Sequence, residues 1–125
     1  MSQKSESQNE LPDDSHTTVS ELRQWMQTFV DQRDWQQFHS PKNLAMSLAI
    51  EAGELMEHFQ WISMDESRSI DEQQRHDVAE ELADVICYAM SIANSLNLDV
   101  ATAVHQKMIK NRLKYPAEDF KGRFG

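Results

Sequence analysis

The sequence has few glycines and prolines, a single cysteine and no long hydrophobic run. Three glycines and 3 prolines among 125 residues are typical of a chain made mainly of long helices. Cys87 is the only cysteine, so a disulfide within the chain is excluded and a reducing cytoplasm is expected; among apolar neighbours, it is predicted to be a small core residue. Without a signal peptide core, or the roughly 18 apolar residues of a membrane span, no membrane contact is expected.

Basic residues are also scarce. Lys and Arg number 12 against 21 Asp and Glu, a net charge of −9. Because non-specific binding of nucleic acid depends on basic surface, no nucleic acid partner is expected. Residues 1–16 are polar and predict a disordered tail, 17–116 predict one domain, and 117–125 a C-terminal tail. The small core of such a domain favours subunit association.

The alternation of period two that marks strands is missing, and apolar residues recur instead at helical spacing. We predict an all-α, four-helix bundle-like fold. The expected helices run from caps at Thr17–Ser20 to about Asp34, from Pro41 to Trp61, from Asp71 to Asn97 and from the cap Asp99 to Tyr115. Residues 62–69 are expected to be a connector.

Two pairs of carboxylates, each three residues apart, lie among apolar neighbours. Glu51 and Glu54 share one face of the second predicted helix, and Glu81 and Asp84 share one face of the third. Glu51 stands in line with a leucine stripe where packing alone would favour another leucine. Since buried carboxylates are costly unless a cation lies between them, the four acids predict a Mg²⁺ site, with Mn²⁺ as an alternative ion.

Basic and amide side chains follow on the fourth predicted helix. Lys107 and Asn111 share one face, with Arg112 beside it, and cations near a metal cage can hold phosphate oxygens. The alternative interpretation is a solvated basic face, which we favour for Lys110 and Lys114.

Aromatic side chains lie at predicted helix ends or beside the acidic face. The residues placed where a nucleobase could stack are Trp35, Phe38, Trp61 and Tyr88, with Trp35 and Trp61 the best candidates. His39 could be a hydrogen-bonding partner in the same loop. The same residues could instead be core aromatics and a surface histidine, and the residues alone leave both interpretations open.

Taken together, these segments closely resemble the MazG-like all-α NTP pyrophosphohydrolases, and within them the dCTP pyrophosphatase-like subgroup. The likeness covers about Leu22 to Pro116. Its motifs are RDWQQFH at 33–39, PKNL at 41–44, EAGE at 51–54, FQW at 59–61, EELADV at 80–85, and the Lys107 to Pro116 segment. The animal dCTP enzymes carry a histidine in the first helix where this chain has Met26.

The resemblance implies hydrolysis of a nucleoside triphosphate, dCTP or modified dCTP, to the monophosphate and pyrophosphate, in nucleotide-pool sanitation. It implies a MazG fold assembled as a homotetramer (a dimer of dimers) or a homodimer, with sites between subunits. Glu51, Glu54, Glu81 and Asp84 would hold Mg²⁺, and one of them would orient or deprotonate the water. The residues implied for substrate binding are Trp35, His39, Asn43, Trp61, Tyr88, Lys107, Asn111 and Arg112.

Two other functions fit parts of the pattern. A housekeeping hydrolase of non-standard triphosphates would use the same acids with little base preference. A helical interaction module would carry the acids only as surface charge, and would release no pyrophosphate.

Overall fold

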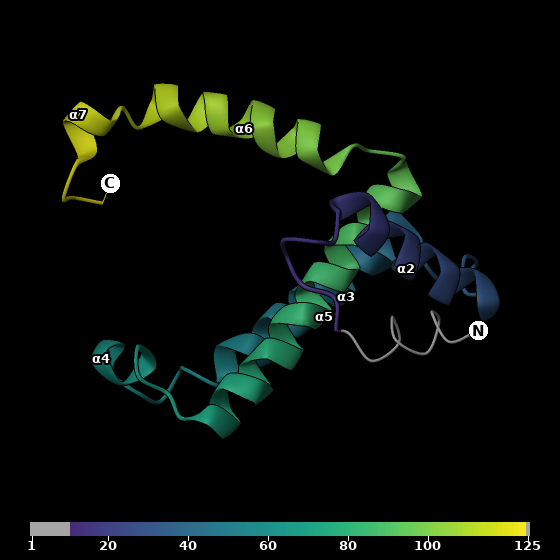
Figure 1. Cartoon of the computed structure of the whole chain (residues 1–125), viewed down its shortest axis with the longest axis horizontal. Helices are drawn as coiled ribbons and strands as arrows, with labels where there is room; N and C mark the ends of the chain where they lie inside the picture. Colours follow the sequence, from purple (N-terminus) through teal and green to yellow (C-terminus); the bar gives the residue numbers. More distant parts are fainter. Residues whose placement is uncertain (1–10, 125) are drawn as a thin grey trace.

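In the computed structural model, which describes residues 11–124, the chain is helical and has no strand in that range. The helices are α2 (Val19–Gln32), α3 (Pro41–Glu57), α4 (Met64–Ser67), α5 (Glu72–Leu96), α6 (Val100–Lys114) and α7 (Ala117–Phe120), shown in Figure 1. The all-α prediction is confirmed. Of the tail expected to be disordered, residues 1–10 lie outside the described residues, and Asp13 to His16 form a turn.

Side-chain caps fix where the long helices begin. Thr18 and Glu21 form a capping box at α2, and Ser40 accepts a hydrogen bond from the Asn43 N–H ahead of Pro41. Asp71 and Asp99 cap α5 and α6 in the same manner. Each cap satisfies N–H groups that a helix cannot pair internally, so the predicted starts are confirmed to within two residues.

Two predicted boundaries are wrong in detail. Helix α3 ends at Glu57 rather than Trp61, because the N–H of Phe59 donates to the Met56 carbonyl and tightens the chain into turns. The connector contains α4, which begins with a capping box between Ser63 and Glu66. No glycine or proline marks either boundary, so the spacing of apolar residues predicted an end of the second helix that is too late in the sequence.

The centre of the fold is the antiparallel pair α3 and α5, which pack along their length (Figure 1). Leu44 from α3 and Ala93 from α5 are buried there. Helix α2 lies against the end of α5, where Arg23 Nε donates to Asn94 Oδ1 (3.0 Å) and Asn94 Nδ2 donates to the Arg23 carbonyl (2.9 Å). This reciprocal pair fixes the position of α2 relative to the two central helices.

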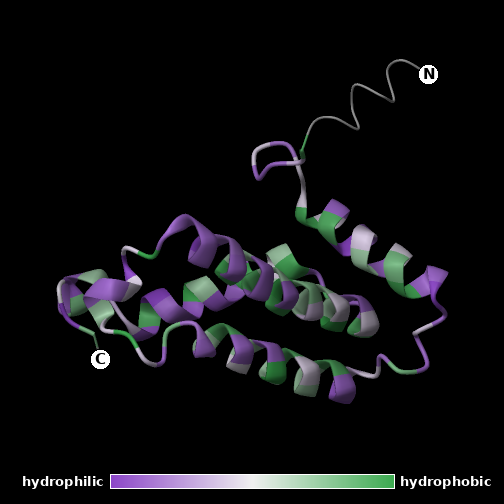
Figure 2. Cartoon of the chain, turned by 90° about the horizontal axis from the view of Figure 1, so that it is seen from below, coloured by the Kyte–Doolittle hydropathy of each residue, from purple (hydrophilic) through white to green (hydrophobic). Residues whose placement is uncertain are grey.

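Helix α6 does not complete a four-helix bundle within one chain. It turns away after α5 and projects from the other helices (Figure 1), and residues 101–110 are all exposed. Hydrophobic and hydrophilic positions are interleaved along every long helix in Figure 2. Within residues 11–124, no helix is long and apolar enough to cross a membrane.

Candidate functional site

Three carboxylates meet where α3 packs against α5. Oxygens of Glu51, Glu81 and Asp84 all lie within 4.8 Å of one another, and Glu54 lies beside Glu51, one turn further along α3. Antiparallel packing produces this arrangement because it brings the middle of α3 opposite the first half of α5. The two acid pairs inferred from spacing therefore face each other.

The cluster has unbalanced negative charge. Oε2 of Glu51 and Oε2 of Glu81 are buried and accept no hydrogen bond within the described residues. Hydrogen bonding with Glu54, followed by desolvation and the charges of the other acids, raises the pKa of Glu51 to about 7. Burial and the charge of Glu54 raise the pKa of Glu81. Oxygen ligands this close, with unpartnered lone pairs, fit a hard divalent cation.

A cavity of about 390 Å³ opens beside the cluster and shares Asp84 with it. Its walls come from α2, the α2–α3 loop and α5, and they combine aromatic, sulfur and hydroxyl groups: Met26, Phe29, Val30, Trp35, His39, Asp84, Cys87, Tyr88 and Ser91. Trp35, His39 and Tyr88 were predicted as substrate-binding residues, and the structure brings all three to this cavity. Cys87 is half-buried in its wall, and burial raises the pKa of the thiol.

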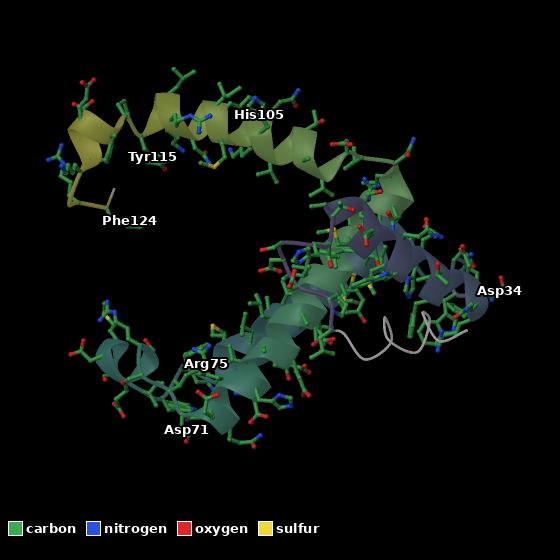
Figure 3. All side chains as sticks on the ribbon, in the orientation of Figure 1. Asp34, Asp71, Arg75, His105, Tyr115 and Phe124 are labelled. Atoms are coloured by element: carbon green, nitrogen blue, oxygen red, sulfur yellow. The ribbon has the colours of Figure 1, made fainter. Side chains whose placement is uncertain are left out.

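The end of α2 places the aromatic wall. Asp34, labelled in Figure 3, has a left-handed backbone with φ +52°. The N–H of Trp35 donates to the Val30 carbonyl (3.1 Å) and that of Asp34 to the Asp31 carbonyl (3.2 Å), which is the hydrogen-bond pattern of a Schellman cap. The cap reverses the chain, so that the Trp35 ring meets Phe29 edge-on, with ring centroids 5.6 Å apart.

Two other predicted substrate residues lie outside this cavity. Asn43 Nδ2 donates to the Phe38 carbonyl (3.1 Å) and so braces the α2–α3 loop, while its side chain borders a second cavity with His39 and Tyr88. Trp61 is 87% exposed on the turn after α3. Among the described residues, Trp61 borders neither of the two cavities that contain His39 and Tyr88.

Lys107, Asn111 and Arg112 lie on α6, and the single chain does not bring them to the acids. The helix carries them away from α3 and α5 (Figure 1). Lys107 borders a shallow groove formed only by α6 residues. Their predicted role therefore needs another copy of the chain, or it is absent.

Sequence reasoning did not identify Phe29 and Ser91 as residues of the site. Both occur at spacings typical of helix packing, and neither is a residue type that signals nucleotide binding by itself. Their place in the cavity wall depends on how α2 sits on α5, which no local pattern specifies.

The chain has an all-helical fold with paired carboxylates on antiparallel helices, and comparison with known proteins assigns it to a family. It belongs to the MazG-like family, whose model matches residues 46–123 and so includes both acid pairs. Among curated proteins it is similar to dCTP pyrophosphatase 1 of Rattus norvegicus, with 38% identity over 107 residues that cover 84% of this chain and 63% of the relative.

Two further comparisons agree. The dCTP pyrophosphatase 1 of Homo sapiens is 39% identical over 102 residues, which cover 80% of this chain and 60% of that protein. The chain thus spans about three fifths of the length of these curated relatives. The crystal structure of a pyrophosphatase from Archaeoglobus fulgidus superposes with a TM-score of 0.75 at 39% identity, covering 86% of this chain and 99% of that one.

The raised pKa of Glu51 predicts a pH-dependent penalty in the metal-free protein. Between its usual value of 4.5 and about 7 the folded state retains a proton that the unfolded state has lost. Stability from this group is therefore present below pH 4.5 and lost as the pH rises through 7. With a chelator present, the melting temperature of Glu51→Gln should equal that of the wild type near pH 4. It should exceed the wild-type value by an increasing amount as the pH rises to 8, as measured by calorimetry.

Glu57→Gln is the matched control, because Glu57 is an exposed carboxylate of α3 outside the cluster. Its difference from the wild type should not follow this pH trend. Added Mg²⁺ should raise the melting temperature of the wild type more at pH 8 than at pH 5, and raise that of Glu51→Gln less. A difference between Glu51→Gln and the wild type that is constant with pH would contradict the repulsion inferred for the cluster.

Proposed function

We propose that the chain is a nucleoside triphosphate pyrophosphohydrolase that converts dCTP, or a modified dCTP, to the monophosphate and pyrophosphate, in nucleotide-pool sanitation. The observation that carries the proposal is the shared wall between the carboxylate cluster and the aromatic cavity, formed by Asp84. The carboxylate cluster suits a metal-bound triphosphate, and the adjoining aromatic cavity suits a base. The names of the similar proteins support the same reaction and substrate.

Mg²⁺ is the proposed cofactor, and Mn²⁺ could replace it. Glu51, Glu81 and Asp84 would hold the ion, with Glu54 beside them, because their oxygens are close together and two of them lack partners. A bound divalent cation neutralises phosphate oxygens and makes coordinated water more acidic. The remaining task for the chain is to accept the proton of the attacking water, and a carboxylate of the cluster is the base at hand.

The base would enter the cavity lined by Trp35 and Tyr88. A volume of about 390 Å³ lies in the range of small-ligand pockets. Trp35 offers a stacking face, and His39 carries a buried ring nitrogen, Nδ1, with no partner among the described residues. An unpaired polar atom in an aromatic pocket is suited to a hydrogen bond with a base edge.

We also propose that a second copy of the chain completes the site. The chain exposes 10486 Å² of surface, against about 6900 Å² for a compact monomer of this mass. Large apolar side chains are exposed on α6, among them Val104, Ile109 and Leu113. An assembly, as a homodimer or a homotetramer, would bury them.

The charge distribution indicates how the copies meet. Residues 100–125 contain six basic and two acidic residues, whereas residues 1–99 contain six basic and nineteen acidic ones. The basic α6 of one copy is thus complementary to the acidic α3–α5 pair of another. In that arrangement the phosphate in the neighbouring site would be contacted by Lys107, Asn111 and Arg112. The exposed Trp61 would be covered by the other copy.

A panel of nucleotides tests the proposed substrate. With Mg²⁺ present, dCTP or 5-methyl-dCTP should show the highest kcat/KM among the four standard dNTPs and their common modified forms, as measured by pyrophosphate release. Similar rates with all bases would favour the housekeeping hydrolase instead. If no triphosphate yields pyrophosphate, and Mg²⁺ plus nucleotide causes no thermal shift, the results would favour the helical interaction module.

Removing a metal ligand should abolish turnover without unfolding the chain. Glu51→Gln and Asp84→Asn should each reduce the rate at least about a hundredfold, the scale of a lost general base or metal ligand. Helical circular dichroism should be unchanged, and Glu57→Gln should turn over normally. Near-normal rates in either cluster variant would refute the assignment.

Complementation tests the shared site. Lys107→Ala should lower kcat/KM at least about tenfold, as for a lost charged hydrogen bond. Lys110→Ala, on the same helix, should have little effect. When Glu51→Gln and Lys107→Ala chains are refolded together, about a quarter of wild-type activity should return, because half of the sites in mixed dimers are intact. Mixed oligomers without recovered activity would show that Lys107 does not act across the interface.

A further inference from the structure

We propose that Arg33 is a positioning residue that holds the aromatic wall of the base cavity in place. Arg33 borders neither the cavity nor the carboxylate cluster, so it does not touch the bound base. The proposal rests on the proposed function, since it assumes that the cavity receives a base. It assigns to this arginine an effect on substrate affinity exerted through Phe29 and Trp35.

Two contacts fix the guanidinium group of Arg33. Its Cζ lies 3.7 Å from the centroid of the Phe29 ring, which is a cation–π contact. Its Nη1 donates to the Phe29 carbonyl at 3.1 Å. That carbonyl needs a partner, because the Arg33 N–H donates to Val30 and not to Phe29 at the end of the helix. The arginine therefore closes the helix and covers one face of the ring at the same time.

The contact continues from Phe29 into the cavity. Phe29 meets Trp35 edge-on at 5.6 Å and an interplanar angle of 75°, and the Trp35 and His39 rings follow at 6.0 Å. All three rings border the cavity. Phe29 thus contacts both a cation and the Trp35 ring, and its orientation depends on both.

Trp35 benefits from such support because it is partly exposed. Its side chain is 40% exposed, and the Schellman cap fixes its backbone but not its ring. An exposed ring that is free to change rotamer loses conformational freedom when a base stacks on it, and that loss lowers affinity. By holding Phe29 against Trp35, Arg33 would remove this cost before the substrate arrives.

Steady-state kinetics of Arg33→Gln with dCTP and saturating Mg²⁺ test the proposal. KM should rise about two- to fivefold, the scale of one exposed cation–π contact, while kcat changes little. Arg33→Lys, which keeps a cation but loses the planar group, should recover part of the affinity. Arg68→Gln is the matched control, because Arg68 is an exposed arginine that pairs with Asp65 of α4, and it should have the wild-type KM.

A second readout does not depend on activity. In a Trp25→Phe, Trp61→Phe background, which leaves Trp35 as the single tryptophan, acrylamide without nucleotide should quench Trp35 more strongly in Arg33→Gln than in the parent. Higher KM together with stronger quenching supports the positioning role. Unchanged quenching, or a KM equal to that of the wild type, overturns the positioning role. A lowered melting temperature, with KM and kcat altered together in both Arg33 variants, also overturns it. If the wild type itself releases no pyrophosphate from dCTP, the proposed function fails, and the quenching result still decides whether Arg33 fixes the ring.

Discussion

Carboxylates that repel one another lie at the contact between α3 and α5, and the rest of the structure is arranged around that contact. The hydrogen bond with Glu54 is the largest cause of the raised pKa of Glu51, and packing close to Glu81 and Asp84 adds desolvation and charge repulsion to it. A chain with a small core would be expected to place leucine there. The acids are retained at a cost to stability, and a bound cation would offset that cost.

The end of α2, rather than the face of a helix, brings the aromatic wall of the cavity to the acids. The reciprocal hydrogen bonds of Arg23 and Asn94 set α2 against α5, and the cap at Asp34 then turns the chain back toward the cluster. Trp35 and His39 therefore stand over the same stretch of α5 that carries Asp84. The proposed metal site and the proposed base site thus lie side by side along one helix.

The exposed α6 links the fold to its assembly. It carries apolar and basic residues on an otherwise acidic chain, yet it stays clear of the acidic α3 and α5 of its own chain (Figure 1). Association would bury Leu113 and its apolar neighbours and place Lys107 beside negative charge. The same contact would thus bury the apolar side chains of α6 and bring its basic residues to the phosphate groups of the neighbouring site. Assembly and substrate binding would therefore depend on each other.

The sequence by itself determined the helical class, the cap at Asp99 and the two acid pairs, because each depends on spacing within a few residues. It did not determine that α3 stops at Glu57, since a turn without glycine or proline leaves no local mark. Only the tertiary structure decided that Phe29 joins the cavity wall and that α6 stays apart from the acids. Those outcomes depend on how helices distant in sequence pack, and such packing is set by the sum of many contacts rather than by any one motif.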